Sequence, residues 1–432
     1  MKNEHERDDE GRRLSRRNFL VKSSIAPIAG MLGAMELKAR PIPSPAGTRP
    51  AAIQDPVNMA VVGFGQWGRE IVSTLARIPE SNVAAIVDTY DVMLRRAERA
   101  VPGAVTHEDY RAVLDDSSIT SVLIATPTHA HRQIAIDALD AGKHVYLEAP
   151  IASTIDDARA IARAAREADG QIFQTGLLYR TDPQYRSVFQ FIRSGALGKP
   201  TMARQQWHSK ESWRRASPNR EREDEQNWRL DPEHSLGLIG EIGIQQLDPA
   251  VWFAGQRPSS VTGFGQIMLW NDGRTIPDTV QAIIAFPDDL HLIYDATLTS
   301  SFDDAYEMYY GRDSTIMMRD SKAWMFKEVD APLLGWEVYA RKDTFYREKG
   351  ITLAANATQL AAQNVDPAAD DPNVESSLWY ALKDFTDNHF FGPYPPAAGF
   401  LEGFQATVFS IKAHEAVMER ARVDLEDDLF EL

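Results

Sequence analysis

Three glycines that directly follow a short apolar run constrain the fold of this 432-residue chain more than any other feature. The run Val57–Val62 has the composition of a buried parallel strand, and the segment after Gly68 is typical of a helix. In that context Gly63 permits a tight turn, Gly65 lets a pyrophosphate approach the backbone, and Gly68 allows close packing of helix on strand. We therefore expect an N-terminal Rossmann domain whose first loop binds a dinucleotide. The loop residues expected to contact it are Gly63, Phe64, Gly65, Gln66, Trp67 and Gly68.

A carboxylate closes the next predicted strand. Residues 83–87 form an apolar run, and Asp88 follows them, twenty residues beyond Gly68. A carboxylate at this position accepts hydrogen bonds from the adenosine ribose hydroxyls and repels a 2′-phosphate. We therefore expect NAD as the cofactor rather than NADP.

The alternation of strands and helices continues to residue 175. Apolar runs and helical patterns follow one another at 119–125, 132–141, 144–147, 155–168 and 172–175. This order predicts a doubly wound parallel sheet, in which ligands bind beyond the carboxyl ends of the strands. The residues at those ends that we expect to line the cofactor are Thr126, Pro127, His131, Glu148 and Ala149.

Four sequence blocks carry a resemblance to a known family. They are ATPT at 125–128, followed by His131, AGKHVYLEAP at 141–150, YRTDP at 179–183, and IRSGALGK at 192–199. In these blocks the chain resembles the glucose–fructose oxidoreductase / inositol dehydrogenase (Gfo/Idh/MocA) family. The resemblance implies an α/β Rossmann domain plus an α+β domain with a large, mostly antiparallel open sheet. It also implies a sugar or polyol substrate, one sheet face that closes over the nicotinamide, and another that often forms homo-oligomers.

The domain organisation follows from the same pattern. We expect the NAD-binding Rossmann domain over 57–178 and a substrate and oligomerisation domain over 179–432, whose final helices pack back on the Rossmann domain. Residues 261–270, 279–286 and 290–300 alternate as strands do and are separated by turn residues, so we expect them to be neighbouring strands.

Two positions depart from the family's catalytic pattern. The resemblance places a lysine where this chain has Ala149 and a histidine where it has Gln245. Oxidising an alcohol releases a hydroxyl proton, and a positioned base accelerates the transfer by roughly 10²–10⁴-fold. Neither alanine nor glutamine accepts a proton, so a dehydrogenase would need another base. The register of the family places the catalytic positions at Tyr179, His208, Glu241 and Gln245, with Glu211 as a further candidate base.

Aromatic and charged side chains gather between residues 207 and 229, outside an obvious strand pattern. Aromatic faces bind the C–H surfaces of sugars, and planar polar groups bind their hydroxyls, so the cluster indicates a sugar site. His208 or Trp228 taken alone fits packing or a surface pair as well. Residues 214–231 are strongly charged, which is typical of a mobile loop. The residues expected to contact the substrate are Arg180, Trp207 and Asp248.

Three functions remain open at this point. The first is an NAD(P)-dependent oxidoreductase with a base of its own. The second is an NAD-dependent glycoside hydrolase or lyase, in which transient oxidation of a sugar carbon acidifies the neighbouring C–H bond and permits elimination. The third is a catalytically silent sugar-binding protein.

The first residues have the form of an export signal. Residues 15–22 contain paired arginines followed by Phe and Leu, and 23–35 are uncharged and mildly apolar. We expect a twin-arginine signal peptide over 1–39, a Pro-rich arm over 40–56, and a periplasmic or secreted protein. Because this route carries folded proteins, the cofactor would travel bound and stay bound through turnover.

Composition excludes several partners and sites. The formal net charge is −16, which argues against nucleic acid and anionic membrane surfaces as partners. The chain has no cysteine, so disulfides and thiolate metal sites are excluded. Its ten histidines show no metal-binding spacing, and no apolar run is long enough to span a membrane.

Overall fold

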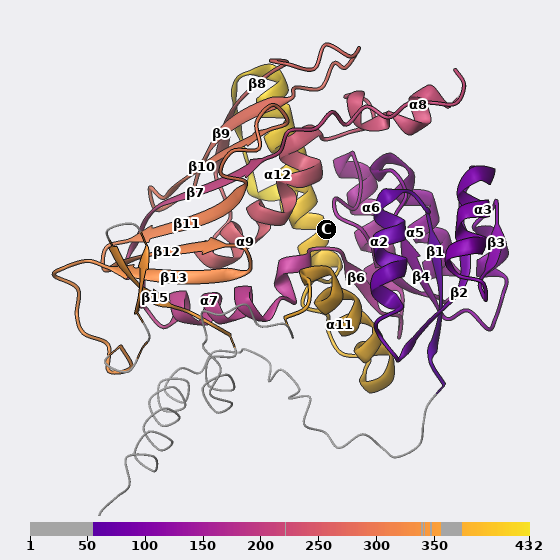
Figure 1. Ribbon diagram of the computed structural model, residues 1–432, viewed down its shortest axis with the longest axis horizontal. Coiled ribbons are helices and arrows are strands. Elements are labelled where there is room, and N and C mark those ends of the chain that lie inside the picture. Colours follow the sequence, from indigo (N-terminus) through magenta and orange to yellow (C-terminus); the bar gives the residue numbers. More distant parts are fainter. Residues whose placement is uncertain (1–54, 221, 338–339, 341, 346–347, 356–373) are drawn as a thin grey trace, which may run out of the picture.

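A computed structural model describes residues 55–432 except 221, 338–339, 341, 346–347 and 356–373. The signal peptide expected at 1–39 and most of the arm expected at 40–56 lie outside the described residues. The described chain contains two β-sheets, one parallel and one mostly antiparallel, with helices packed against both (Figure 1).

The first sheet has six parallel strands in the order β3-β2-β1-β4-β5-β6. The strands are β1 (Val57–Val62), β2 (Ser81–Val87), β3 (Val105–His107), β4 (Ser121–Ile124), β5 (His144–Leu147) and β6 (Phe173–Thr175). The helices between them are α2 (Gln66–Leu75), α3 (Asp91–Ala100), α4 (Arg111–Leu114), η1 (Thr128–Ala130), α5 (His131–Asp140) and α6 (Ile155–Glu167). The predicted doubly wound Rossmann sheet is confirmed. Its first helix begins at Gln66, earlier than the glycine spacing predicts.

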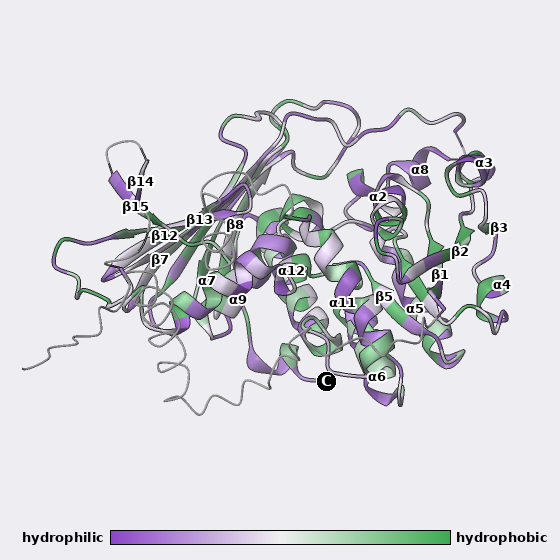
Figure 2. Cartoon of the chain, turned by 60° about the horizontal axis from the view of Figure 1, so that its bottom comes forward, coloured by the Kyte–Doolittle hydropathy of each residue, from purple (hydrophilic) through white to green (hydrophobic). Residues whose placement is uncertain are grey.

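β1 is buried on both faces, which explains its unbroken apolar run. Met59 and Val61 pack on the side of α2, whereas Ala60 and Val62 pack on the side of α5 and α6. Figure 2 shows the strands of this sheet as mostly hydrophobic and the outer helix surfaces as hydrophilic. Burial of a strand on both faces is the pattern expected of a parallel sheet covered by helices.

The second sheet has ten strands in the order β14-β15-β13-β12-β11-β7-β10-β9-β8-β16. They are β7 (Pro200–His208), β8 (Ser260–Gln266), β9 (Thr279–Ala285), β10 (His291–Thr297), β11 (Ala305–Gly311), β12 (Ser314–Arg319), β13 (Lys322–Lys327), β14 (Lys342–Phe345), β15 (Glu348–Thr352) and β16 (Arg422–Asp424). Between these described strands, every pair except β7 with β10 is antiparallel. The large, mostly antiparallel sheet that the resemblance implies is therefore confirmed.

The three strands expected to be neighbours do pair, as β8, β9 and β10. β8 nevertheless ends at Gln266 rather than at residue 270, because the chain turns around a buried carboxylate. The backbone N–H groups of Met268, Leu269 and Trp270 all donate to Asp278, at 2.8–2.9 Å. These donors are satisfied without a partner strand.

Helices cover one face of the second sheet, which we call the inner face. α9 (Ile244–Ala254), the π-helical turn η4 (Leu238–Ile242) and α12 (Phe400–Glu419) contact strands β7, β8, β9 and β10 (Figure 1). In β9 the buried side chains Val280, Ala282 and Ile284 alternate with the exposed Gln281 and Ile283. The opposite face, called the outer face, therefore presents the alternate residues of each strand.

The last helices connect the two sheets. α12 packs on β8 of the second sheet and also on α6 of the Rossmann domain. α11 (Ser377–Phe391) packs on α2 and on the turn η2 (Leu178–Arg180). The remaining helices are α7 (Pro183–Arg193), α8 (Glu223–Gln226), η3 (Trp228–Leu230) and η5 (Asp427–Phe430). Within the described residues, no helix has both the length and the apolar character that crossing a bilayer requires.

Candidate nucleotide site and adjoining side-chain cluster

The glycine loop between β1 and α2 has the shape that a bound dinucleotide requires. A Cβ atom on Gly68 would lie 1.9 Å from the carbonyl oxygen of Gly63, and one on Gly63, whose φ is +96°, would lie 2.7 Å from the oxygen of Ala125. A Cβ on Gly65 would meet nothing within 4 Å. Gly63 and Gly68 are thus needed for packing, whereas the backbone at Gly65 faces open space at the N-terminus of α2.

Asp88 is held beside this loop. Its carboxylate accepts hydrogen bonds from the backbone N–H groups of Phe64 and Tyr90, both at 2.8 Å. Burial raises the pKa of Asp88, while these two hydrogen bonds and the charge of Arg222 oppose the rise. The loop and the end of β2 are therefore fixed together, which places a carboxyl group next to the open space at Gly65.

The loops that follow β4 and β5 meet at a buried histidine. The two ring nitrogens of His131 lie 2.9 Å from the carbonyl oxygen of Thr126 and 3.1 Å from that of Pro150. Burial lowers the pKa of His131 to about 4, so the ring is neutral at pH 7. His131 thus joins the predicted cofactor-lining loops, and Pro127 lies between Thr126 and η1.

Glu148 is a buried carboxyl group at the end of β5. Burial raises its pKa to about 8, so it is mostly protonated at pH 7. Its Oε1 atom has no hydrogen-bond partner among the described residues. An unpartnered buried polar atom is costly unless a ligand or water satisfies it. With the glycine loop and Asp88, this atom fits a site for a nicotinamide nucleotide.

Ala149 and Gln245, the two positions at which the sequence predicts a departure from the family pattern, both contact protein. Ala149 packs with Leu177 and Ile244 in a small apolar cluster. Gln245 uses both ends of its amide on the loop after β6: Nε2 donates to the oxygen of Gly176 at 2.8 Å, and Oε1 accepts from the N–H of Leu178 at 3.1 Å. Gln245 therefore joins α9 to the Rossmann domain, and neither residue offers a proton acceptor.

Arg180 and Asp248, both expected to contact the substrate, bind each other. The guanidinium forms two hydrogen bonds to the carboxylate, at 2.7 and 2.8 Å, and the side chains are only 16% and 5% exposed. This geometry ties η2 to α9 and leaves the pair little capacity for a ligand.

Tyr179 stacks on Tyr185, with ring centroids 4.0 Å apart and planes 6° apart. Burial raises the pKa of the Tyr179 phenol. The same residue lines a cavity beside the glycine loop, together with Gln66, Trp67 and Leu178. Tyr179 therefore lies close to the candidate site, but its hydroxyl stays protonated.

His208 requires a correction. It and Trp207 are the last residues of β7, not part of an irregular cluster. Gln205 donates to the oxygen of Gln246 in α9, so its side chain lies on the inner face. Because side chains alternate along a strand, Trp207 also lies on the inner face and His208 lies on the outer face. His208 binds Asp295 at 2.7 Å there. This position does not fit the predicted catalytic role.

A second cluster joins the domains beyond the carboxyl end of β4. The Thr128 hydroxyl and the N–H of Leu236 each donate to a carboxylate oxygen of Glu241, both at 3.0 Å. Burial raises the pKa of Glu241, and the charge of Arg229 opposes that rise. Arg229 is exposed and lies over the ring of Trp228, at 4.9 Å. The charges of Glu241 and Glu211 both raise the pKa of Arg229, so two predicted bases lie near this guanidinium.

The same cluster contains a histidine that the sequence motifs did not indicate as catalytic. His129 is exposed, and its ring lies 4.4 Å from that of His234 and 5.9 Å from that of Trp228. Nδ1 of His234 lies 3.1 Å from a carboxylate oxygen of Asp231. Burial and the neighbouring His234 lower the pKa of His129. Its place directly after β4, where ligands of such sheets bind, was the signal available in the sequence.

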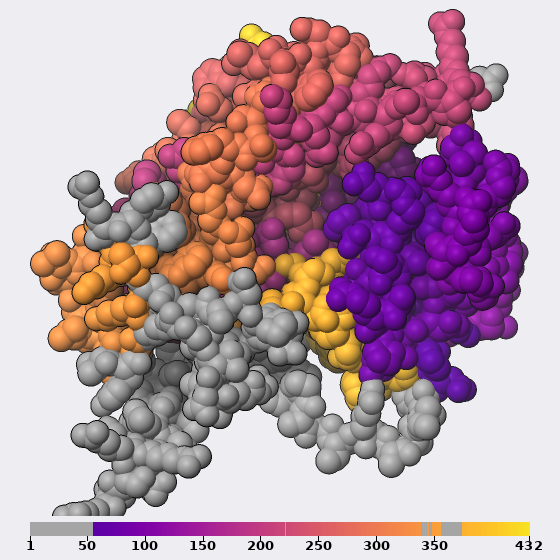
Figure 3. All heavy atoms as spheres, viewed as in Figure 1, coloured from indigo at the N-terminus to yellow at the C-terminus, as the bar shows by residue number. Residues whose placement is uncertain are grey.

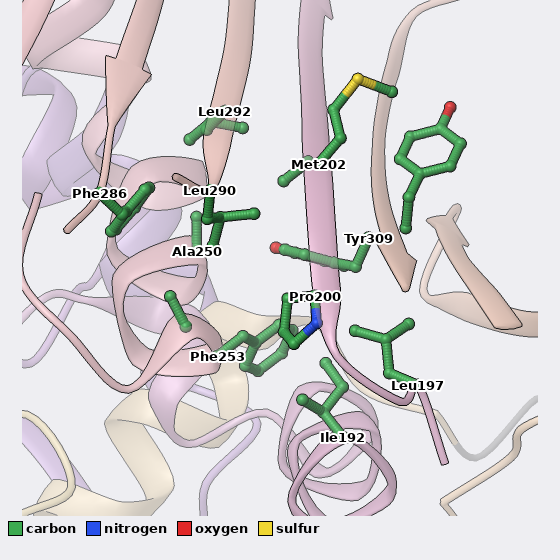
Figure 4. Close-up of a pocket in the computed structure, with 13 residues that line it drawn as sticks. Ile192, Leu197, Pro200, Met202, Ala250, Phe253, Phe286, Leu290, Leu292 and Tyr309 are labelled. Atoms are coloured by element: carbon green, nitrogen blue, oxygen red, sulfur yellow. The ribbon is translucent and has the colours of Figure 1, made fainter. Parts of the chain in front are cut away.

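A second cavity lies between α7, α9 and the inner face of the second sheet (Figure 4). Its lining is apolar and includes Ile192, Leu197, Ala250, Phe253, Leu290 and Leu292. None of the predicted site residues lines it, so it belongs to the core of the second domain. Within the described residues, no group of acidic and histidine side chains could hold a metal ion.

Comparison with known proteins identifies the family. Residues 57–176 match the family described as "Oxidoreductase family, NAD-binding Rossmann fold", and residues 185–315 match the "GFO/IDH/MocA C-terminal domain". Together these matches cover more than half of the chain.

Individual proteins are similar over shorter stretches or at lower identity. The scyllo-inositol 2-dehydrogenase (NAD(+)) of Bacillus subtilis is 27% identical over 49% of this chain and 58% of its own length. The glycosyl hydrolase family 109 protein 2 of a Shewanella species is 28% identical over 52% of this chain and 54% of its own length. The chain thus spans just over half the length of these relatives.

The fold is also similar to a solved structure. Levoglucosan dehydrogenase in complex with NADH and L-sorbose superposes with a TM-score of 0.70 and 21% identity, over 86% of this chain and 100% of that chain. With both family matches in chain order and the two sheets in place, the chain belongs to the Gfo/Idh/MocA family of NAD-binding oxidoreductases.

Proposed function

We propose that this protein is an NAD-dependent oxidoreductase that acts on a sugar or polyol and keeps its cofactor bound through turnover. The observation that carries the proposal is the open backbone at Gly65 beside the fixed carboxyl of Asp88. These residues would hold the pyrophosphate and the adenosine ribose, respectively. A carboxylate next to the ribose supports NAD over NADP.

The proton of the substrate alcohol needs an acceptor in this chain. When bound, a nicotinamide nucleotide accepts the hydride from the alcohol carbon, and the hydroxyl proton must go elsewhere. We assign that role to His129, because its ring is exposed and its lowered pKa keeps it neutral. His234, paired with Asp231, lies against His129 and can pass the proton on.

The side chains near His129 also include groups suited to a carbohydrate. Trp228 offers an aromatic face, and Arg229 offers planar donors beside it. Trp207, on the inner face of the second sheet, is half-buried. Such a combination binds the C–H surfaces and hydroxyls of sugars.

Export supports the retained cofactor. The twin-arginine form of residues 15–22 favours transport of the folded, loaded protein. Outside the cytoplasm, a bound cofactor that one substrate reduces is best reoxidised by a second substrate on the same protein. Detection of the mature protein in the periplasmic fraction, and its loss when the paired arginines become lysines, tests this localisation.

The outer face of the second sheet supports self-association. Met202, Phe264, Ile283 and Ile293 lie on it and are exposed. We propose that a second copy of the chain covers this face, and light scattering of the purified protein measures the resulting mass. A monomer at micromolar concentration contradicts this assignment.

A second function is favoured by one feature of the site. Ala149 stands where the dehydrogenases have lysine, and a similar protein carries the name of a glycosyl hydrolase family. In that alternative the protein would cleave a glycoside through transient oxidation, without net consumption of NAD.

A single preparation tests these functions. Protein released by heat should yield NAD in stoichiometric amount, and NADP in its place would contradict the ribose assignment. Incubation with polyols, aldoses and glycosides, with and without a second sugar as oxidant, separates net oxidation from net cleavage. A protein that contains no nicotinamide nucleotide and binds none would overturn both enzyme proposals. Sugar binding without any product would identify a silent binding protein.

A further inference from the structure

A segment of the second domain extends across the candidate nucleotide site. Residues 209–220 and 222–231, called the strap, leave β7 and reach over the Rossmann domain, with α8 near α3 (Figures 1 and 3). The strap is anchored at its start by the N–H of Ser209, which donates to Thr297 at 2.9 Å. Arg214 donates to the carbonyl oxygen of Asp272 at 2.6 Å. The strongly charged loop predicted from the sequence is thus anchored to the second domain at both of these points.

Arg215 connects the strap to the glycine loop. Its Nη2 atom donates to Oε1 of Gln66 at 3.0 Å. Gln66 is the first residue of α2, directly after Gly65, so the guanidinium lies beside the helix N-terminus. Asn227 fixes the backbone of Arg215, because it accepts from its N–H at 2.7 Å and donates to its carbonyl oxygen at 3.1 Å. The side chain is therefore positioned by a rigid backbone.

The charge at this point is unbalanced. Arg215 is exposed, and among the described residues no carboxylate forms an ion pair with it. The N-terminus of a helix carries a partial positive charge and outward-pointing N–H groups. A guanidinium held beside it adds a second positive charge, and an anion between the two would stabilise both.

Arg222 lies where the strap contacts the predicted adenosine end of the site, near Tyr90 and Asp88. Its guanidinium lies 4.1 Å from the centroid of the Tyr90 ring. Its charge also opposes the rise in the pKa of Asp88, so it lies close to that carboxyl group. Arg215 and Arg222 therefore mark the pyrophosphate end and the adenosine end of the predicted site.

We propose that the strap closes over the bound dinucleotide, with Arg215 binding its pyrophosphate and Arg222, supported by Tyr90, covering its adenosine. This inference rests on the proposed function and names the residues that retain the cofactor. The Rossmann loop alone leaves one side of the nucleotide open to solvent. The strap adds two cationic side chains from the second domain, and the nucleotide cannot leave until both contacts open.

The experiment measures release of the nucleotide rather than activity. The full chain is loaded with NADH and mixed with excess NAD, and the loss of protein-bound NADH fluorescence gives the dissociation rate. A charge-assisted hydrogen bond to phosphate contributes enough that we expect Arg215→Gln to release NADH about ten- to hundredfold faster. Arg222→Gln should act in the same direction. Arg220→Gln removes an exposed charge from the same strap and is the matched control.

The outcomes separate the two proposals. The proposal that the strap closes over the nucleotide is supported if Arg215→Gln and Arg222→Gln release NADH faster and Arg220→Gln does not. All three variants should have the wild-type melting temperature in the absence of nucleotide. Wild-type protein that binds NADH but releases it at the same rate as both variants overturns the strap and leaves the proposed function intact. Equal acceleration in all three variants indicates a general charge effect and also overturns it. Wild-type protein that binds no nucleotide overturns the proposed function itself.

Discussion

At the scale of single residues, two histidines with similar sequence contexts have opposite positions. His129 and His208 each end or follow a strand and have polar neighbours in sequence. The structure places His208 on the outer face, bound to Asp295, and His129 against His234. Alternate residues of a strand point to opposite faces of the sheet, so a shift of one position along β7 would move His208 to the inner face.

The two histidines make a matched pair of variants. We expect His129→Gln to lower turnover of the best substrate in the panel by about 10²–10⁴-fold, because a general base is lost. NAD content should stay unchanged, since the glycine loop is untouched. In wild-type protein the rate should fall as the pH drops through the pKa of His129, which lies below the ordinary value of 6.5. His208→Gln should retain turnover. Near-normal rates in His129→Gln would remove it from the mechanism.

The sequence could predict residues whose role depends on near neighbours. The glycine spacing and the carboxylate at Asp88 are local signals, and the structure places them together as expected. Arg180, Asp248 and Gln245 are different, because their partners lie 67–69 residues away in the chain. Their side chains bind protein rather than ligand, and only tertiary structure decides that.

At the scale of elements, two glycines in the turn from β1 to α2 have different roles: Gly68 is needed for packing, and Gly65 for binding the ligand. A Cβ on Gly68 would overlap the backbone of Gly63, so Gly68→Ala should lower the free energy of unfolding by about 1–3 kcal/mol. A Cβ on Gly65 meets no protein atom within 4 Å, so Gly65→Ala should keep its nucleotide-free melting temperature and lose affinity for NAD. Calorimetric melting and titration with NAD measure the two effects. Gly103→Ala, also in open space, is the control.

Equal NAD affinity in Gly65→Ala and wild-type protein would contradict the placement of the pyrophosphate.

The boundaries of the elements show where prediction from local sequence pattern fails. β8 ends four residues earlier than its apolar run predicts, because Asp278 satisfies the backbone donors of 268–270 in place of a strand. A side chain eight to ten residues away decides that boundary, and hydrophobic periodicity contains no such information.

At the scale of the whole molecule, the two sheets are held together by elements from the end of the chain. α12 packs on β8 and on α6, and the hydroxyl of Thr407 accepts from the N–H of Ile151 at 3.0 Å, next to the loop after β5. The N–H of Thr175 at the end of β6 donates to Ala398 at 2.7 Å. Helical periodicity predicts the helices, but the partner of Thr407 is 256 residues away and follows only from the assembled fold.

Buried titratable groups give the molecule a characteristic dependence of stability on pH. Burial lowers the pKa values of His131, His144 and His414 to about 4. The unfolded chain binds their protons near pH 6.5, so their contribution to stability is lost as the pH falls from 6.5 towards 4. Burial raises the pKa values of Glu148 and Glu307 to about 8 and about 7. The unfolded chain releases those protons near pH 4.5, so their contribution is lost as the pH rises towards 8.

The two contributions oppose each other between pH 4.5 and 6.5, and above 6.5 only the carboxyl groups continue to change. We therefore expect the melting temperature to fall between pH 6.5 and pH 8, with a slope near pH 7.5 that corresponds to about one proton, that of Glu148. Glu148→Gln should remove the fall above pH 7. Glu307, which lies in the second domain among Tyr185, Gln205 and Tyr309, should contribute mainly below pH 7. Glu307→Gln should therefore remove only that contribution and leave the contribution of Glu148. A wild-type melting temperature that stays level or rises from pH 6.5 to pH 8 would mean that Glu148 is ionised in the folded protein. Its unpartnered oxygen would then need a cation or a hydrogen-bond donor, and the described residues provide neither.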